Sequence, residues 1–389
     1  MRSNKPLNFD PGECWKRAQR SDVPLCEDLE DHFKELYRQF LDELMIYDRQ
    51  THLQVERYQR GKQRVDQANG FYTRSLTSSF GTVELRVPRT RSGQFQTQVI
   101  ERYQRRTGPV DQAIKQVFLS GVSTRQTGAA LAGLLGDRVS AGTVSAVSKV
   151  LDEEVRQWHF RDLKDDYEYL IFDAVSVRIR LVGSVKRRMV LCAYGITVQG
   201  QRELIDFLIV KTESEAHWKT FLLNLFHRGL KGAALQLITT DGNAGLDAAL
   251  HYTWPRAAHQ RCWAHKLRNL ENKLKATQKR CLDEARAIYQ APHRQKALQL
   301  FRAWKRTWEM SAPKAVACLE EDLEAMLAFF DCPKKRWVKV RTTNIIERAF
   351  VEVRRRIRTM CSFTTQSSCE RILYSVFQRM NTNWEKRRL

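Results

Sequence analysis

The sequence contains no apolar run of the roughly 18–20 residues that a membrane-spanning helix needs. Its longest apolar stretches, such as residues 189–198, are interrupted and have the length of a strand. Residues 1–6 lack the apolar core of a signal peptide. The nine cysteines follow no repeating framework, and their odd number indicates reduced thiols rather than a disulfide scaffold. We therefore expect a cytoplasmic protein.

Acidic residues are far outnumbered by basic ones in this chain. Its 389 residues include 44 Asp and Glu against 66 Lys and Arg, which gives a formal net charge of +22. Such an excess attracts polyanions and is typical of nucleic-acid-binding proteins. An anionic membrane surface fits less well, because no segment combines a strong helical moment with a purely basic face. A protein that is merely kept soluble by its charge is the plain alternative.

Three of these acids stand at positions that suggest a shared site. Residues 235–240 read as a short buried strand that ends on Asp241, and the apolar run 167–172 ends in the same way on Asp173. Glu347 follows near the start of a predicted helix. A carboxylate at the end of an apolar strand is costly unless a cation meets it. We therefore predict that Asp173, Asp241 and Glu347 hold two Mg²⁺ ions, for which Mn²⁺ can substitute, against a phosphodiester.

Each acid also has an ordinary structural explanation. Asp173 could simply terminate a strand, and Asp241 with its following glycine could form a turn. Glu347 could return to Asn344 as part of a helix cap. On that helix Ile346, Phe350, Val353 and Ile357 form the predicted buried stripe, which places Glu347 on one flank. Glu352 lies on the other flank and is the competing third acid.

The surrounding pattern predicts a mixed α/β fold. Strands are expected near residues 167–173, 187–197 and 202–210, followed by a helix over about 214–229 and then by the Asp241 strand. Three antiparallel strands, a helix and a strand parallel to the first form the order of a ribonuclease H-like sheet. In that order the first and fourth strands are neighbours, so Asp173 and Asp241 should lie side by side.

The residues before this sheet predict two smaller structures. A loose arm over residues 1–28 and a helix over about 29–66 precede a hairpin-like unit of strands at 70–77 and 82–88. Its open face would hold arginines that either grip phosphates or form a solvated strand face, namely Arg74, Arg86, Arg89 and Arg91.

Residues 109–155 form the second of these structures, a three-helix block typical of a helix-turn-helix, although such blocks also serve as scaffolding. The first helix should span 110–119 and end at Gly121, a capping box at 123–126 should open the second, 133–137 should turn, and Ser140 should start the third. The expected DNA contacts are Ser140, Thr143, Ser148 and Lys149, with Arg125 on a phosphate.

A cysteine and a histidine follow the second acid at three-residue spacing. Cys262 and His265 could share a helical face and bind zinc, but no nearby motif completes the four ligands of a closed site. Packing beside the Asp241 strand is the preferred interpretation, which would place Arg261, Lys266 and Arg268 near DNA. Residues 262–335 show helical spacing throughout, and the tail after them is the most basic part of the chain, with Arg354, Arg355 and Arg356.

We accordingly divide the sequence into five parts. They are a helical arm with the hairpin unit, the helix-turn-helix-like region, the first part of the ribonuclease H-like core, an all-helical insertion, and the Glu347 helix with a basic tail. Their expected bounds are 1–108, 109–160, 161–261, 262–335 and 336–389.

Several motifs in this order resemble those of Mutator-type transposases of bacterial insertion sequences. They include residues 70–74 with 81–91, 101–105, 121–125 with 139–145, 240–246, 260–265 and 341–348 with 354–356. The resemblance implies a DDE transposase whose ribonuclease H-like domain is interrupted by a helical insertion. It assigns the catalytic acids to Asp173, Asp241 and Glu347, and a Cys-x-x-His signature to Cys262 and His265.

The same resemblance implies binding to the terminal inverted repeats of a mobile element and Mg²⁺-dependent DNA strand cleavage and joining. Because two ends must be joined to one target DNA, we expect a homodimer or a larger assembly on double-stranded DNA, associated with the nucleoid. The alternatives are a ribonuclease H-like nuclease or junction resolvase without strand transfer, and a domesticated DNA-binding protein without catalysis.

Overall fold

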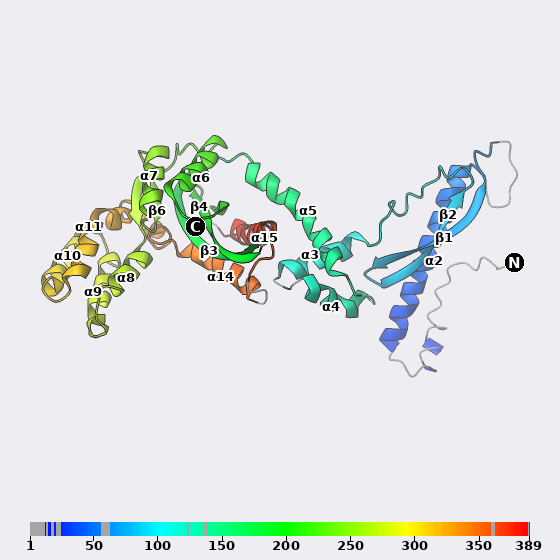
Figure 1. Ribbon diagram of the computed structural model, residues 1–389, viewed down its shortest axis with the longest axis horizontal. Coiled ribbons are helices and arrows are strands. Elements are labelled where there is room, and N and C mark those ends of the chain that lie inside the picture. The colour runs from blue at the N-terminus through cyan, green and yellow to red at the C-terminus, as the bar shows by residue number, and fades with distance from the viewer. Residues whose placement is uncertain are drawn as a thin grey trace. The chain divides into compact units, whose positions relative to one another are not determined.

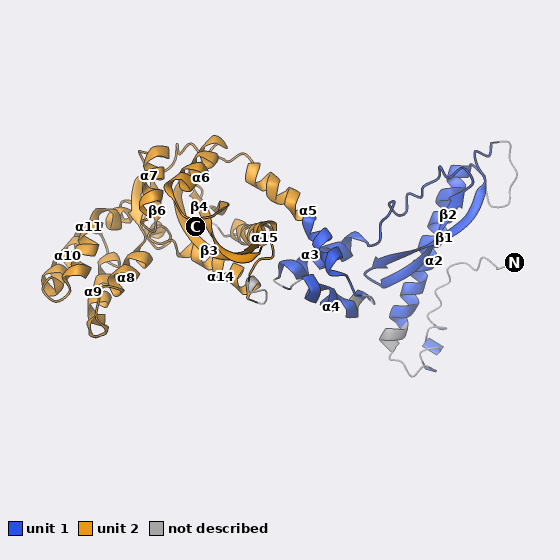
Figure 2. Ribbon diagram, in the orientation of Figure 1, with its two compact units in different colours: residues 1–149 blue, residues 150–389 orange. Residues whose placement is uncertain are grey.

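The computed structural model describes residues 12, 15–16, 19–20, 25–55, 63–120, 122, 124–135, 138–181, 183–358, 362–387 and 389, apart from the side chains at 25–28, 134 and 357. The chain forms two compact units, residues 1–149 and 150–389, and the division falls within helix α5 (Ala141–Phe160) (Figure 2). Most of the predicted loose arm, the break at Gly121, the capping residue Ser123 and the end of the turn at 136–137 lie outside the described residues.

A long helix and a two-stranded ribbon form the first part of unit 1. Helix α2 (Leu25–Leu53) packs on the antiparallel strands β1 (Ala68–Ser78) and β2 (Gly81–Thr90), which confirms the predicted hairpin. The helix ends at Leu53, and residues 63–66 are not helical, so it is shorter than expected. One apolar core joins the helix and the ribbon, with Leu41, Met45, Leu76, Leu85 and Val87 among its buried side chains.

The three predicted helices of the second part of unit 1 are present as α3 (Gly108–Leu119), α4 (Thr124–Leu135) and α5. They share a core that includes Ile114, Phe118, Leu131 and Val144. Ser140 starts α5 as expected, because its hydroxyl accepts a hydrogen bond from the Thr143 backbone N–H (3.1 Å). A glycine is required at position 128, inside α4, because a Cβ there would lie 1.9 Å from the Val139 carbonyl oxygen.

A five-stranded mixed sheet forms the centre of unit 2. Its strands are β3 (Tyr167–Leu181), β4 (Ser184–Thr197), β5 (Arg202–Val210), β6 (Leu237–Thr240) and β7 (Ala258–Arg261), in the order β5-β4-β3-β6-β7, of which β3, β4 and β6 are labelled in Figure 1. The first three are antiparallel, whereas β6 runs parallel to β3 and β7 parallel to β6. The predicted adjacency of the first and fourth strands of this sheet is therefore confirmed. The fifth strand, β7, was not predicted.

Side chains of β3 alternate between two apolar cores, as the pleat of a strand requires. Leu170 and Phe172 enter a core with α6 (Glu215–His227) and α7 (Ala244–Thr253), whereas Tyr169 and Ile171 face the opposite core. The predicted stripe of α6 is confirmed, since Trp218, Phe221, Leu222 and Leu225 are all buried.

Two helices that follow the insertion cover the second face of the sheet. Helices α14 (Asn344–Ile357) and α15 (Gln366–Glu385) pack there, and β3 and β4 curve around α15 in Figure 1. The segment expected to be only a basic tail thus contains a packed helix. Its basic composition masks an apolar stripe that is buried in the structure, Ile372, Leu373, Val376 and Phe377.

The segment between β7 and α14 is helical, as predicted. It consists of α8 (Trp263–Glu271), α9 (Lys279–Tyr289), α10 (Arg294–Trp308), α11 (Pro313–Glu321), α12 (Leu323–Leu327) and α13 (Trp337–Val340), with short 3₁₀ turns at Ala276–Gln278, Ala328–Asp331 and Lys334–Arg336. Throughout the described residues, no helix combines the length and the apolar character needed to cross a membrane.

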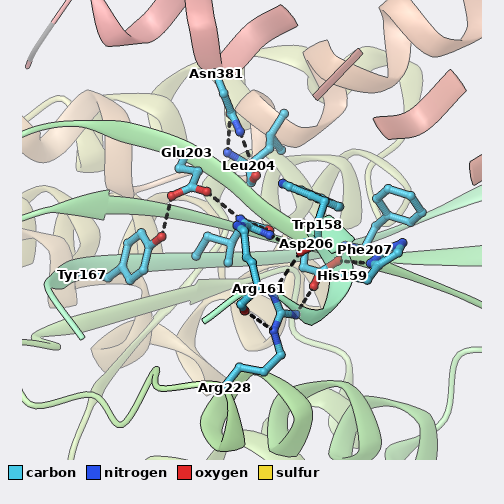
Figure 3. Close-up of polar contacts among 11 residues, drawn as sticks. Trp158, His159, Arg161, Tyr167, Glu203, Leu204, Asp206, Phe207, Arg228 and Asn381 are labelled. Atoms are coloured by element: carbon cyan, nitrogen blue, oxygen red, sulfur yellow. Dashed lines mark hydrogen bonds and ion pairs between the residues drawn. The ribbon is translucent and has the colours of Figure 1, made fainter. Parts of the chain in front are cut away.

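A buried polar network fixes the end of α5 to strand β5 (Figure 3). Asp206 is 3% exposed and accepts hydrogen bonds from the Arg228 guanidinium, while the His159 Nδ1 lies 2.6 Å from its Oδ1. Arg228 also donates to the carbonyl oxygens of Arg161 (2.8 Å) and Trp158 (3.3 Å). The end of α5 is therefore held through the backbone carbonyls of Trp158 and Arg161 as well as through the His159 side chain.

Candidate active site

Asp173 and Asp241 occupy equivalent positions along two neighbouring parallel strands. The last paired residues of β3 and β6 are Ile171 and Thr239, and each acid follows two residues later, Asp173 within β3 and Asp241 immediately after the end of β6. Adjacent strands are about 4.8 Å apart, so the two side chains start from neighbouring positions. Asp173 does not end its strand, contrary to the prediction, because β3 continues to Leu181. The neighbouring strand β6 is the one that ends, at Thr240, and this opens the sheet beside Asp173.

A compact group of ligand atoms surrounds Asp173. One ligand atom from each of Asp173, His265 and Glu347 lies within 4.8 Å of the others, and no second group of this kind occurs among the described residues. Glu347 comes from the first turn of α14 and His265 from α8. Asp241 is not part of this closest group, but its charge contributes to raising the pKa of Asp173. The structure therefore brings Asp173 and Glu347 together with His265, and Asp241 lies close enough for its charge to act on Asp173.

The Asp173 carboxyl is buried and only partly satisfied. Its Oδ1 accepts a hydrogen bond from the Ala174 N–H (2.8 Å), whereas its Oδ2 has no hydrogen-bond partner. Burial raises the pKa of Asp173 to about 7, the nearby Thr343 hydroxyl lowers it, and the charges of Asp241 and Glu347 raise it further. A buried oxygen without a partner, beside two more carboxylates, fits a divalent cation that prefers oxygen ligands.

Helix α8 aims two side chains at Glu347. The Arg268 guanidinium donates to Glu347 Oε1 (2.6 Å), and His265 Nε2 lies 3.8 Å from the same oxygen. Burial lowers the pKa of His265, so its ring is neutral at neutral pH and can act as a metal ligand. The sequence interpretation assigned His265 to packing, although its three-residue spacing from Arg268 already indicated a shared helical face.

Thr343, which no sequence argument singled out, connects the elements of the site. It is fully buried and immediately precedes α14. Its backbone N–H donates to the Cys262 sulfur (3.3 Å), and its hydroxyl lies 3.6 Å from that sulfur and 3.4 Å from His265 Nδ1. Burial raises the pKa of Cys262, which therefore stays a thiol. Cys262 and His265 thus join α8 to the start of α14, and no group of three ligand atoms in the described chain includes Cys262.

The loop after β6 holds Asp241 in place. Asp241 Oδ1 accepts from the Asn243 N–H (3.0 Å), and the Asn243 side chain in turn caps α7. Gly242 has φ +97°, and a Cβ there would lie 2.1 Å from Arg261 Nη1. The Arg261 guanidinium is fixed by Asp247 (2.9 Å) and lies 3.8 Å from Asp322 of the helical insertion. The glycine after Asp241 is therefore required both by its backbone conformation and by this arginine.

The expected DNA contacts of unit 1 lie on α4 and at the start of α5. Arg125, Ser140 and Lys149 are exposed, and Thr143 is half-buried. Ser148 is different, because its hydroxyl is fully buried and donates to the Val144 carbonyl oxygen (2.7 Å). The expectation that Ser148 contacts DNA does not agree with this position.

The expected DNA contacts of unit 2 divide in the same way. Arg354 and Arg355 are exposed on α14, and Arg268 is half-exposed beside Glu347. Lys266 is buried, and its ammonium donates to Asp322 and to the Cys318 carbonyl oxygen (3.1 Å), so it does not face solvent as expected. Arg356 is also buried, and its Nη1 donates to Glu352 Oε2 (3.0 Å).

Glu352 is engaged by its own helix rather than by the acid cluster. Besides accepting from Arg356, its carboxylate lies 3.2 Å from Arg355 Nη1. It is absent from the one group of metal-ligand atoms in the described chain, whereas Glu347 belongs to that group. The structure therefore favours Glu347 over Glu352 as the third acid.

The fold and the site together define a class: a mixed α/β protein whose carboxylates and imidazole cluster where strand β6 ends beside β3, with ligand types that suit a divalent cation. Comparison with known families gives the family itself. The profile described as "Transposase, Mutator family" matches residues 13–387. The chain belongs to the Mutator family of transposases.

Similar curated proteins come from several bacteria. The chain is 34% identical over 355 residues to the transposase for insertion sequence element ISRM5 of Rhizobium meliloti, covering 91% of this chain and 89% of that protein. It is 32% identical over 363 residues to the transposase for insertion sequence element IS256 in transposon Tn4001 of Staphylococcus aureus, covering 91% of each. The transposase for IS406 of Burkholderia multivorans is 33% identical over 355 residues, with 90% of each chain covered.

Proposed function

We propose that this chain is a DDE transposase with a ribonuclease H-like catalytic domain. It binds the terminal inverted repeats of its mobile element and catalyses Mg²⁺-dependent DNA strand cleavage and strand transfer. The proposal is supported chiefly by the strand register, in which Asp173 and Asp241 each follow two residues after the last pair of β3 and β6, and by the proximity of Glu347 on α14 to Asp173. The strand order and the helical segment before Glu347 support the ribonuclease H-like assignment.

Each acid has a distinct part in this proposal. When bound, two Mg²⁺ ions supply the activation of water or a 3′-hydroxyl and the stabilisation of the leaving oxygen. Asp173, whose carboxyl interacts with both other acids, would bind both ions, whereas Asp241 and Glu347 would each bind one. His265 would complete the ligands on the Glu347 side. Arg268 orients the Glu347 carboxylate and, being half-exposed, can also reach a DNA phosphate.

DNA would contact both units. In unit 1 the α3–α5 block would act as a helix-turn-helix, with Ser140, Thr143 and Lys149 at the groove and Arg125 on a phosphate. In unit 2 the exposed Arg354 and Arg355 would add salt-dependent phosphate contacts beside the acids. Two ends and one target must meet during strand transfer, so the active form would be a homodimer or a larger assembly on DNA.

The test is cleavage of the element's own ends by purified protein with Mg²⁺. Glu347→Gln should abolish cleavage while keeping repeat binding and the far-UV circular dichroism spectrum. Glu352→Gln, the matched change on the opposite flank of α14, should retain cleavage. Equal loss in both variants, or no cleavage by the wild type with Mg²⁺ or Mn²⁺, would overturn the proposal.

Strand transfer needs a separate assay with pre-cut ends and a target duplex. Joined products support a transposase. Cleavage without joining would instead identify a ribonuclease H-like nuclease.

A further inference from the structure

The segment around the β1–β2 ribbon of unit 1 is unusually rich in arginine. Between residues 63 and 106 the sequence has eight arginines, no lysine and three acids, so its formal charge is 8 − 3 = +5. Arginine, unlike lysine, presents a planar fork of N–H donors that matches phosphate oxygens. None of these arginines belongs to the proposed catalytic site or to the three-helix block.

Four of these arginines have side chains that are not bound by an acid. In the part of the chain that the structure describes, no ion pair is formed by Arg86, Arg89, Arg102 or Arg105. Arg38, on the adjacent α2, shows the contrast, because its guanidinium is bound by Glu35 and Asp42 (both 2.8 Å). The guanidinium groups of the four arginines are therefore not held by an ion pair, although Asp42 lies near Arg86 and accepts a hydrogen bond from its backbone N–H (2.9 Å).

Aromatic rings hold three of these guanidinium groups in place. Arg86 lies over the Phe71 ring at 4.9 Å, Arg89 over Tyr72 at 4.8 Å, and Arg102 over Tyr103 at 5.2 Å, each measured to the ring centroid. Stacking occupies the face of a guanidinium and leaves its N–H edge free for a further acceptor. The arginines are thus oriented before any ligand arrives.

The rings themselves are on the surface. Phe71, Tyr72 and Tyr103 are 37%, 38% and 77% exposed, although α2 offers an apolar core nearby. Tyr103 also has φ +67°, a conformation that is uncommon for a residue with a side chain. Two hollows of about 590 and 450 Å³ adjoin these rings, and arginines line both.

We propose that this surface, which includes side chains from both faces of the β1–β2 ribbon and from the segment after it, binds the phosphate backbone of duplex DNA. We name it the arginine ribbon and define it as Phe71, Tyr72, Arg86, Arg89, Arg102, Tyr103 and Arg105. Pre-oriented guanidinium groups that form no ion pair complement the regular phosphates of a duplex. The arginine ribbon is additional to the helix-turn-helix contacts and rests on the proposed function only in that the protein acts on DNA.

The experiment measures binding of the full-length protein to two labelled duplexes of equal length, one with the element's terminal repeat and one unrelated. Arg86→Ala with Arg89→Ala should weaken binding to both by the same factor, on the order of tenfold. The slope of log affinity against log salt should fall by about 1.8, because each lost phosphate contact contributes about 0.9. Arg86→Lys with Arg89→Lys should recover only part of the affinity, because lysine keeps the charge but lacks the planar fork.

The matched control removes two positive charges elsewhere. Arg302→Ala with Lys314→Ala, both exposed on the helical insertion, should leave binding within about twofold of the wild type. Equal loss in this control, wild-type binding by the ribbon variant, or loss confined to the repeat duplex would overturn the proposal. Unchanged thermal unfolding of each variant shows that the fold is intact.

The same variants separate this proposal from the proposed function. At DNA concentrations that saturate the ribbon variant, its Mg²⁺-dependent cleavage should match that of the wild type. A wild type that binds both duplexes through the arginine ribbon but never cleaves would leave the ribbon assignment standing and remove the transposase proposal.

Discussion

Replacing Thr343 by valine should disturb the acid cluster without removing an acid. Thr343 is fully buried, and its hydroxyl lies beside the Cys262 sulfur, His265 Nδ1 and the Asp173 carboxyl. Valine has almost the same shape, so packing is preserved while the hydroxyl is lost. Thr343→Ser makes the opposite change, because it keeps the hydroxyl and loses a methyl group.

The structure sets the size of the effect. Buried polar groups that lose their hydrogen-bond partner cost about 1–3 kcal/mol of stability, so Thr343→Val should lower the free energy of unfolding by that amount. Thr343→Ser should cost about 0.8 kcal/mol, the value of one buried methyl or methylene group. Loss of the orienting contacts of metal ligands typically weakens metal binding ~10–100-fold. We expect that loss of Mn²⁺ affinity for valine and near wild-type affinity for serine.

Urea unfolding and Mn²⁺ titration by calorimetry measure both quantities. Thr253→Val is the matched control, because Thr253 is also buried but its hydroxyl only donates to the Ala249 carbonyl oxygen within α7 (2.8 Å). It should leave Mn²⁺ affinity unchanged. The reasoning is refuted if Thr343→Val keeps wild-type Mn²⁺ affinity, or if serine loses as much affinity as valine.

Three further predictions follow from the fold and the site. Gly242→Ala should destabilise the protein by about 1–2 kcal/mol, because its φ is positive, and should also weaken Mn²⁺ binding. Gly93→Ala is the control in the same assays: its φ is +73° and a Cβ there has no neighbour within 4 Å, so it should lower stability without changing Mn²⁺ binding. Arg228→Met should cost about 3–5 kcal/mol in urea unfolding because it removes the guanidinium paired with the buried Asp206 carboxylate, and the surface change Arg156→Ala should cost less than about 1 kcal/mol. Mn²⁺ at a hundred times its dissociation constant should stabilise the wild type by about 2.7 kcal/mol, and Asp173→Asn should lose this gain while remaining as stable as the wild type without the ion.

The parts of the fold that the sequence predicted well are those with strong local signals. The stripe of α6 and the alternation of the β1–β2 hairpin both arise from spacing within one element. Strand β7 was missed because its four residues, Ala258–Arg261, contain no run of apolar side chains. Its position is fixed by pairing with β6, which is a tertiary contact and leaves no local pattern.

The candidate site shows the same division. The positions of Asp173 and Asp241 relative to each other follow from strand order, which the sequence did predict. The roles of Thr343 and Lys266 do not, because each depends on a partner far away in the chain, such as the Lys266 contact with Asp322. A lysine read from sequence is a positive charge, and only the fold shows whether that charge faces solvent or an internal acid.

The contacts of Asp322 limit how this protein can be shortened. This insertion residue accepts from Lys266 and lies near Arg261, the side chain that packs over the glycine following Asp241. Excising the insertion to obtain a minimal core would therefore remove one of the two carboxylates near Arg261, leaving Asp247 alone, and would loosen the loop that carries Asp241. In engineering terms, the helical insertion supports the candidate site and cannot be treated as a removable module.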